Sequence, residues 1–362
     1  MATPRLSTNL SDEDPESTGQ EVAWTAAVPL RGRATVAGTP GTGGRLLSTV
    51  LNGLKKYTTL LVLLILMALF SFVSPYFLTS RNLINIVLQN TYFIIVAVGL
   101  SFVMIGGGID LSVGYQMSLV GVVTAMMMVV YQLPVWLAVG IGLLLGTTLG
   151  LINGLIVAQI RTFPLIVTLA TSTIFQGISY LISQAKTYRN YPAEFLFIVN
   201  GRVLGLPFDV FLALVIVICA HFIYSETRFG LRLIALGGNE EAARLVGLNT
   251  RFIKISAYTL CGFLVAIATM VMLAKANTMN SSFGPGTEFV ALTAAIVGGV
   301  SFVGGEGSIP ALVAGVFVLA VLGNGMQLAG WGTYAQYIVR GIILLGAVVF
   351  DEYQKKTRRA LR

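Results

Sequence analysis

Charged side chains are scarce in this sequence. They make up 10% of its 362 residues, whereas 56% of the residues are hydrophobic. A soluble domain carries about 25% charged residues, and a water-soluble chain of this length would need a correspondingly polar surface. The composition therefore excludes a soluble globular protein and predicts a chain that crosses a membrane several times.

Residues that bind metals or form disulfide bonds are also rare. The two cysteines, Cys219 and Cys261, both lie inside apolar runs, and the single histidine, His221, has no cysteine, histidine or acid beside it at ligand spacing. This pattern predicts neither a disulfide framework nor a metal site. Since the chain also shows no Ser/His/Asp set and no paired carboxylates, we expect no enzymatic activity.

Basic residues and glycines are present in excess. The net charge is +8, but the lysines and arginines stand in short flanks beside apolar segments, where they set membrane orientation and do not indicate a nucleic-acid partner. The 40 glycines suit helices whose backbones approach closely and interrupted helices that line a cavity. Both features favour a polytopic protein with tightly packed helices.

Ten apolar segments follow a polar N-terminal stretch. Residues 1–45 are rich in Ser, Thr, Pro and Gly and are predicted to form a disordered cytoplasmic tail, whereas 46–362 form the membrane domain. Segments 112–131 and 287–304 begin with polar, glycine-rich residues, so they are expected to be interrupted or re-entrant. The predicted fold is all-α and polytopic, with about ten transmembrane helices: 58–74, 83–105, 112–131, 135–158, 163–183, 208–224, 254–274, 287–304, 309–329 and 333–350.

The lysines and arginines predict the orientation of these segments. If the N-terminus is cytoplasmic, most of them fall in the tail, in the 225–253 loop and in the C-terminal flank, all on the same side. An excess of Lys and Arg marks the cytoplasmic side. Because the number of crossings is even, both termini are expected in the cytoplasm.

The two halves of the chain carry similar motifs in the same order. Gly106–Asp110 is echoed by Gly284–Glu288, and Leu151–Leu155 is echoed by Leu322–Met326. Five apolar segments separate equivalent points, and this odd number predicts two five-helix halves that are inverted in the membrane. Inverted halves with interrupted helices place the substrate path of many transporters near the midplane. Chance similarity between glycine-rich apolar sequences is the alternative.

The 225–253 loop is longer than a tight connection requires. It contains a short predicted helix, which follows two residues that favour helix starts and ends at a glycine. Leu245, Val246 and Leu248 make this helix amphipathic, so it offers a docking surface; a solvated interfacial helix with no partner is the alternative. The residues predicted to form this coupling element are Gly238, Asn239, Glu240, Glu241, Ala242, Ala243, Arg244 and Gly247.

Asp110 is the strongest single candidate for a functional side chain. An ionisable group within a membrane is normally paired or exposed to water, and glycines surround this one. It would line a translocation path for a hydroxylated solute, or cap the segment that starts at Leu111. The two roles are compatible.

Other polar side chains inside the apolar segments extend this candidate path. For Asn153 and Asn324 the structural alternative is hydrogen bonding between helices. For Glu288 it is capping of the helix that this residue begins. Arg340 is the only base within a late span, where a snorkelling or ion-paired role is expected. The predicted path residues are Asp110, Ser112, Gly114, Gln116, Asn153, Glu288 and Asn324.

Four sequence blocks resemble one family of membrane proteins. Glu241–Gly247 is similar to the Glu-Ala-Ala-x-x-x-Gly loop of ABC-importer permeases, which seats on the ATPase subunit. Gly106–Gly114, Gly154–Leu169 and Gly298–Ser308 narrow the resemblance to ribose-type sugar permeases, within the sugar and branched-chain amino acid permease superfamily. The resemblance runs from about residue 55 to 355, so the N-terminal tail lies outside it.

This resemblance implies a function and a set of partners. A permease of this family forms half of a pore in the bacterial inner membrane, with a second permease copy or a similar subunit. It receives a small hydroxylated solute, most often a monosaccharide, from a solute-binding protein, and two cytoplasmic ATPases supply the energy. Gly38–Arg45 is glycine-rich but lacks the Lys-Ser/Thr of a phosphate loop. ATP and Mg²⁺ are therefore expected on the partner ATPases, with no cofactor in this chain.

Two positions differ from the family pattern. Relatives often have an acid at the position of Val290 and a base at the position of Glu306, which leaves the identity of the sugar open. The alternatives are a branched-chain amino acid or nucleoside permease, an ion-coupled secondary transporter, and a membrane scaffold without transport. An ion-coupled transporter would need intramembrane acids or bases, of which the chain offers few.

Overall fold

The structure is a computed structural model that describes residues 58–160 and 163–360. The tail predicted over 1–45 lies outside these residues. Apart from four two-residue strands, the regular elements of the described chain are helices, as the sequence predicts. The helices are α2 (Thr58–Val73), α3 (Ser80–Ile105), α4 (Val113–Val129), α5 (Val135–Gln159), α6 (Pro164–Ser183), α7 (Ala193–Asn200), α8 (Phe208–Glu226), α9 (Arg228–Gly238), α10 (Glu240–Leu245), α11 (Thr250–Ala276), α12 (Thr287–Val297), α13 (Ile309–Leu328) and α14 (Thr333–Ala360).

Ten of these helices coincide with the ten predicted segments. Within the described residues, seven helices are long and apolar enough to cross a membrane, and α2, α4 and α12 are shorter apolar helices. The chain is therefore an all-helical, polytopic membrane protein. Helix α10 lies where the sequence predicts a short helix, whereas α7 and α9 lie in connections and are not predicted by the hydrophobic pattern.

Helix α12 is shorter than the segment predicted over 287–304. It ends at Val297 because two glycines follow it. Gly299 has a φ of +80°, a conformation that glycine adopts without strain. The N–H of Val300 donates to the carbonyl of Ala295 over 2.9 Å, which is the hydrogen bond of a Schellman motif. The rest of the predicted segment is a loop, so the helix stops short at glycines near the end of the segment and not at the polar start on which the prediction rests.

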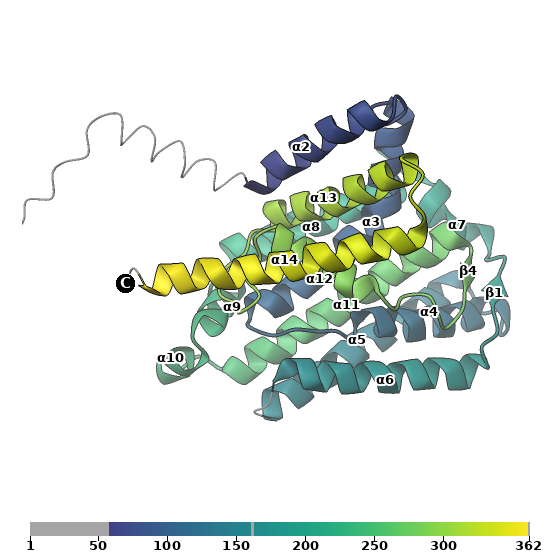
Figure 1. Cartoon of the computed structure of the whole chain (residues 1–362). Helices are drawn as coiled ribbons and strands as arrows, with labels where there is room; N and C mark the ends of the chain where they lie inside the picture. The colour runs from purple at the N-terminus through teal and green to yellow at the C-terminus, as the bar shows by residue number, and fades with distance from the viewer. Residues whose placement is uncertain (1–57, 161–162, 361–362) are drawn as a thin grey trace, which may run out of the picture. The chain divides into compact units, whose positions relative to one another are not determined.

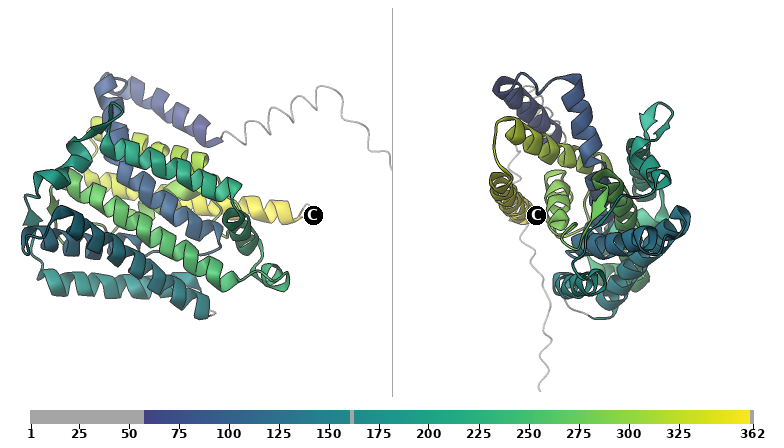
Figure 2. Two further views of the ribbon diagram at one scale, coloured as in Figure 1. Left: turned by 180° about the vertical axis from the view of Figure 1, so that it is seen from behind. Right: turned by 90° about the vertical axis from the view of Figure 1, so that its right-hand side faces the viewer.

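The connections between helices gather at two opposite ends of the bundle (Figure 1). At one end, called the α10 end, lie α9, α10 and the end of α14. At the other, called the strand end, lie α7 and the antiparallel pair of β1 (Tyr188–Arg189) and β4 (Thr278–Met279). A second small hairpin pairs β2 (Arg202–Val203) with β3 (Leu206–Pro207). Seen from the strand end, many helices appear nearly end-on (Figure 2).

The contacts between helices repeat in the two halves of the chain. Helix α3 packs on α12 and α13, and α11, its counterpart five segments later, packs on α4 and α5. Within each half, α4 contacts α5 and α6, just as α12 contacts α13 and α14. This correspondence supports the repeat that the sequence motifs predict.

A row of glycines on α5 lies against α11. Gly146, Gly150 and Gly154 recur every fourth residue, so they share one face of the helix. A Cβ on Gly150 would lie 2.9 Å from the Cα of Gly262, and a Cβ on Gly154 would lie 2.9 Å from the Cα of Ile255. Small residues at this spacing let two membrane helices approach through their backbones.

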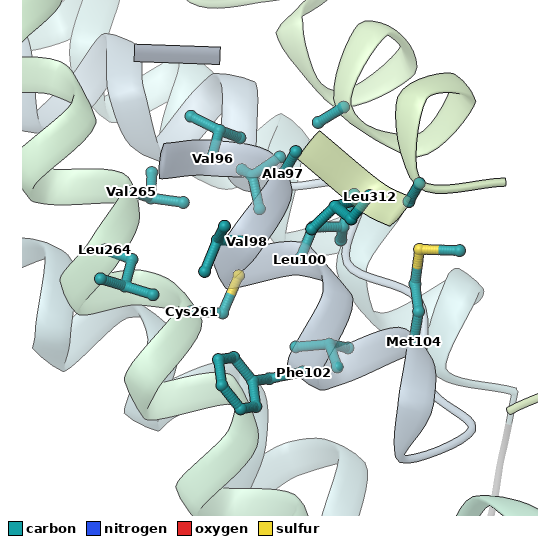
Figure 3. Close-up of a cluster of buried hydrophobic side chains, with 14 of the residues drawn as sticks. Val96, Ala97, Val98, Leu100, Phe102, Met104, Cys261, Leu264, Val265 and Leu312 are labelled. Carbon is teal, nitrogen blue, oxygen red and sulfur yellow. The ribbon is translucent and has the colours of Figure 1, made fainter. Parts of the chain in front are cut away.

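The other side of α11 packs against α3, whose residues 94–105 are all buried. In Figure 3, Val98 and Phe102 of α3 lie beside Cys261 and Leu264 of α11. Such interdigitation supplies the van der Waals contacts that hold helices together inside a bilayer. Helix α11 is thus enclosed by α3 and α5 at the centre of the bundle.

Substituting Gly150 with alanine is expected to destabilise the protein. The added methyl group meets the α11 backbone, which cannot move aside, and overpacking of this kind costs about 1–3 kcal/mol. Gly140 is the matched control on the same helix, because a Cβ there meets nothing within 4 Å and alanine favours the helix by about 0.5–1 kcal/mol. Thermal unfolding in detergent should show a lower Tm for G150A only; equal Tm values would contradict the backbone contact.

Candidate functional site

The chain between α3 and α4 turns back into the bundle through glycines. After α3 ends, the N–H of Gly108 donates to the carbonyl of Val103 over 2.9 Å, and Gly107 has a φ of +79°. A Cβ on Gly108 would lie 2.7 Å from the hydroxyl oxygen of Tyr258. The glycines therefore allow the connector to pass close to α11 and carry Asp110 into the interior.

Asp110 is fully buried and is the acceptor of a compact hydrogen-bonded cluster. Its Oδ1 accepts from the N–H of Ser112 over 2.9 Å and from the hydroxyl of Ser112 over 2.6 Å, and its Oδ2 accepts from Nε2 of Gln116 over 3.3 Å. The Ser112 hydroxyl in turn accepts from Gln116 over 2.8 Å and from Nδ2 of Asn153 over 2.7 Å. Four of the predicted path residues thus form one cluster, which we call the Asp110 cluster.

The Asp110 cluster joins the connector to the start of α4 and, through Asn153, to the last third of α5. Ser112 is the residue before α4, and its own side chain makes no capping hydrogen bond. Asp110 accepts from the N–H of Ser112, which is the contact expected of a cap on a segment that starts at Leu111, whereas α4 itself begins at Val113. The oxygens Oε1 of Gln116 and Oδ1 of Asn153 are buried and have no hydrogen-bond partner among the described residues.

Gly114 and Glu288 come together from the equivalent segments of the two halves. The Oε2 atom of Glu288 accepts from the N–H of Gly286 over 2.9 Å, and it lies so close to Gly114 that a Cβ there would overlap it. A Cβ on Gly114 would also lie 2.7 Å from the carbonyl oxygen of Gly284. The first turns of α4 and α12 therefore meet at a point where only glycine fits.

Substitutions of Asp110 separate hydrogen bonding from charge. Asp110→Asn keeps an acceptor for Ser112, and Gln116 can turn its free oxygen toward the new amide, so we expect a loss of about 1 kcal/mol. Asp110→Ala leaves buried donors unpaired, at a cost of about 1–3 kcal/mol each. Thermal unfolding in detergent and uptake measure the two effects. If D110N leaves both stability and uptake unchanged, Asp110 has no part in transport.

A cavity of about 400 Å³ lies nearer the strand end, between α3, α11, α12, α13 and α14. Of the predicted path residues, only Asn324 lines it, and Val290, a position that departs from the family pattern, lines it as well. Its polar lining residues are Gln89, Asn90, Tyr92, Lys275, Asn324, Gln327, Gln336 and Arg340. The volume falls within the range of about 300–1,000 Å³ that is usual for small-molecule sites.

Two amide groups around this cavity are held by hydrogen bonds, one between helices and one within α3. Nδ2 of Asn324 on α13 donates to Oδ1 of Asn82 on α3 over 2.9 Å, and Nδ2 of Asn82 donates to Oδ1 of Asn324 over 2.8 Å. Nδ2 of Asn90 donates to the carbonyl of Ile86 over 2.7 Å. The predicted interhelical role of Asn324 is thus present together with its place in the cavity wall.

Lys275 connects the cavity to a buried acid that the sequence patterns do not single out. Its Nζ forms an ion pair with Oδ2 of Asp209, which is fully buried at the start of α8. The hydroxyl of Thr91 on α3 donates to the same oxygen over 3.1 Å. The three residues lie more than 60 positions apart in the sequence, so only the folded chain identifies this contact between α3, α8 and α11.

Replacing Lys275 is expected to destabilise the protein through Asp209. Lys275→Met leaves a buried carboxylate without its counter-charge, which costs about 3–5 kcal/mol. Lys275→Arg preserves the positive charge and is the control. The Tm in detergent should fall strongly for K275M and only slightly for K275R. In the double variant D209N/K275M the Tm should recover in part, because the unpaired carboxylate is removed. A K275M variant as stable as the wild type would show that the ion pair does not form.

The coupling element has the start and the end that the sequence predicts. Oδ1 of Asn239 accepts from the N–H of Ala242 over 2.9 Å, and the chain leaves α10 through Gly247, which has a φ of +84°. Leu245 and Val246 are 86% and 76% exposed, respectively. This short helix therefore presents apolar side chains that no described part of the chain covers.

Glycines from three segments connect α9 to the end of α3. A Cβ on Gly304 would lie 2.7 Å from the Cα of Gly107 and 3.1 Å from the Cα of Gly237. The N–H of Gly305 donates to the carbonyl of Ile105 over 2.9 Å. We call Gly107, Gly237, Gly304 and Gly305 the glycine junction.

A groove of about 940 Å³ opens beside this junction at the α10 end. Five coupling residues line it together with Gly106, Gly107 and Gly108: Gly238, Asn239, Glu240, Glu241 and Arg244. Glu240 is fixed there by Lys254, whose Nζ donates to both carboxylate oxygens over 2.7 Å. The structure thus places the coupling element next to the connector that carries Asp110.

Comparison with known proteins identifies the family to which this chain is similar. Residues 82–348 match the family described as branched-chain amino acid transport system / permease component. The chain is 35% identical to the ribose import permease protein RbsC of Escherichia coli K12, over 82% of this chain and 94% of the relative. It is 34% identical to the D-allose transport system permease protein AlsC (83% and 93%) and 35% identical to the L-arabinose transport system permease protein AraH (84% and 93%), both of Escherichia coli K12. No solved structure matches the chain.

Proposed function

The chain belongs to the ribose-type sugar permease family of ABC importers, and from this premise we propose that it is the membrane-spanning permease of an ATP-driven importer for a monosaccharide. The observation that carries the proposal is the amide-lined cavity between α3 and α11–α14. Amide groups both donate and accept hydrogen bonds, which suits the hydroxyl groups of a sugar. The names of the matched relatives, which transport ribose, allose and arabinose, agree with this chemistry.

The proposed orientation places the α10 end in the cytoplasm and the strand end outside. The exposed Leu245 and Val246 would dock on a partner ATPase, which holds ATP and Mg²⁺. A solute-binding protein would deliver the sugar at the strand end, near the cavity. A second permease copy, identical or similar, would complete the pore in the bacterial inner membrane.

The proposed coupling runs from α10 to the connector that carries Asp110. When the ATPases close, α10 would move with them and carry α9 along. At the glycine junction the backbones of α9 and the end of α3 lie in direct contact, and Leu233 and Phe229 of α9 also pack on the end of α3, so the displacement would reach the Asp110 cluster and the start of α4. Rocking of such segments exposes a solute path alternately to the two sides.

Two other functions are alternatives to a sugar importer: ion-coupled transport, and ATP-driven import of a branched-chain amino acid or a nucleoside. An ion-coupled transporter would use intramembrane acids, for which Asp110 and Glu288 are the candidates. Both buried carboxylates accept hydrogen bonds, and the third buried acid, Asp209, is in an ion pair. A branched-chain amino acid or nucleoside permease fits the same family, whose model is named for amino acid transport. The relatives that match over most of their length favour a sugar.

Gly247→Ala is expected to weaken ATPase association without preventing membrane insertion. A side chain at this φ is strained by about 1–2 kcal/mol, so the end of α10 would shift. Gly205→Ala is a matched control, because Gly205 has a φ of +80°, its Cβ would also meet open space, and it lies in the β2–β3 turn. Co-purification should lose the ATPase with G247A and with Glu241→Ala and retain it with G205A; retention by all three would contradict the docking role.

Transport by the assembled importer tests the function as a whole. In membrane vesicles that contain the permease, its ATPase and its binding protein, uptake of radiolabelled monosaccharides should require ATP and persist when ion gradients are collapsed. Uptake that stops on collapse of an ion gradient but survives ATP depletion would replace this proposal with ion-coupled transport.

A further inference from the structure

The cavity carries a positive charge that its surroundings do not neutralise. Lys275 and Arg340 are the two charged side chains in its wall, and no carboxylate is among the described residues that line it. Lys275 is already paired with the buried Asp209. Arg340 forms neither an ion pair nor a hydrogen bond with any described residue, so its charge remains.

The acids at the start of α12 and in the later part of α14 form contacts elsewhere. Glu288, at the start of α12, is directed toward Gly114 on α4 and accepts from Gly286. Asp351 lies eleven residues further along α14, about 16 Å along the helix axis, and accepts from the N–H of Phe302. Neither carboxylate forms an ion pair with the guanidinium.

The guanidinium of Arg340 lies beside the amides of the cavity wall. A Cβ on Gly323 would lie 3.3 Å from Nη2 of Arg340 and 3.9 Å from Oε1 of Gln336. Gly323 directly precedes Asn324, and the side chains of Arg340 and Gln336 are both half-buried. Arg340 is thus held against α13 in the cavity rather than extended along the helix toward a membrane surface.

An uncompensated cation within a membrane-spanning segment is costly and marks a ligand site or an ion pathway. The planar donors of a guanidinium match the two oxygens of a carboxylate, with both charge and geometry complementary. A neutral sugar would occupy the amides and leave the charge unpaired. We therefore propose that the solute is a monosaccharide bearing a carboxylate, which pairs with Arg340 while Asn324 and Gln336 hydrogen-bond to its hydroxyl groups. This inference rests on the proposed function as a sugar permease.

Matched pairs of sugars test the assignment in the complete importer. The full-length permease, its ATPase and its binding protein are reconstituted in proteoliposomes, and ATP-dependent uptake is measured. Each acid is compared with its neutral partner: D-galacturonate with D-galactose, D-glucuronate with D-glucose, and D-ribonate with D-ribose. D-ribose 5-phosphate is tested as well. At least one acid should be taken up about tenfold faster than its neutral partner. Arg340→Gln should lower uptake of that acid about tenfold or more, because a charge-assisted pair is lost, and Arg340→Lys should retain part of it.

Arg81→Gln is the matched control, since Arg81 is an exposed arginine at the start of α3 that does not line the cavity; its uptake should equal that of the wild type. Preference for the neutral member of every pair, preference for the sugar phosphate, or unchanged acid uptake by R340Q would each overturn this inference and leave the permease function standing. Failure to take up either member of any pair would contradict the proposed function itself.

Discussion

Helices α5 and α11, and the three segments of the glycine junction, touch through backbone atoms at positions where no side chain fits. Within a bilayer the hydrophobic effect does not draw helices together, so close backbone approach and dense packing are the main source of their association. The contact of α5 with α11 fixes the centre of the bundle. The glycine junction fixes the end of α3 to α9, and every proposed step from the ATPase toward the interior depends on it.

The scarcity of charge makes the position of each charge informative. Asp110 is enclosed by hydrogen-bond donors, and Asp209 is paired with Lys275, so both acids stabilise contacts between helices. Glu240 of α10 pairs with Lys254 near the start of α11, at the α10 end. Arg340 is the exception, because it lies in the wall of the cavity without a partner among the described residues. The proposed recognition of a carboxylate therefore depends on this one side chain, beside the amides of the cavity wall.

Much of the fold follows from local sequence. Long apolar runs predict all ten membrane helices, and the Asn239 and Gly247 signals predict both ends of α10. The early end of α12 at Val297 is less predictable, because its two glycines lie within an apolar run that a span could continue through. Helix α9 is missed because its own sequence shows no long apolar run and its partners, such as the end of α3, are remote in sequence.

The candidate site is only partly predictable for the same reason. Asp110, Ser112, Gln116 and Asn153 do come together, since three of them are close in sequence and share a polar, glycine-rich context. The cavity wall draws residues from five helices that are remote in sequence, and residues such as Gln89 and Gln327 look like ordinary interruptions of apolar runs. Asp209 lies at a helix start, where an acid is unremarkable, until the fold brings Lys275 to it.

The proposed transport cycle requires that the cavity near the strand end and the groove at the α10 end open in turn, as the two mouths of one path. Gln327 and Gln159 are exposed residues that line the cavity and the groove, respectively. Single cysteines at these positions, in a variant without Cys219 and Cys261, can be labelled with a membrane-impermeant maleimide in the assembled importer. If the cycle operates in this way, trapping the ATPases with ATP and vanadate changes the two labelling rates in opposite directions. Labelling rates that are the same in the nucleotide-free and trapped states would contradict it.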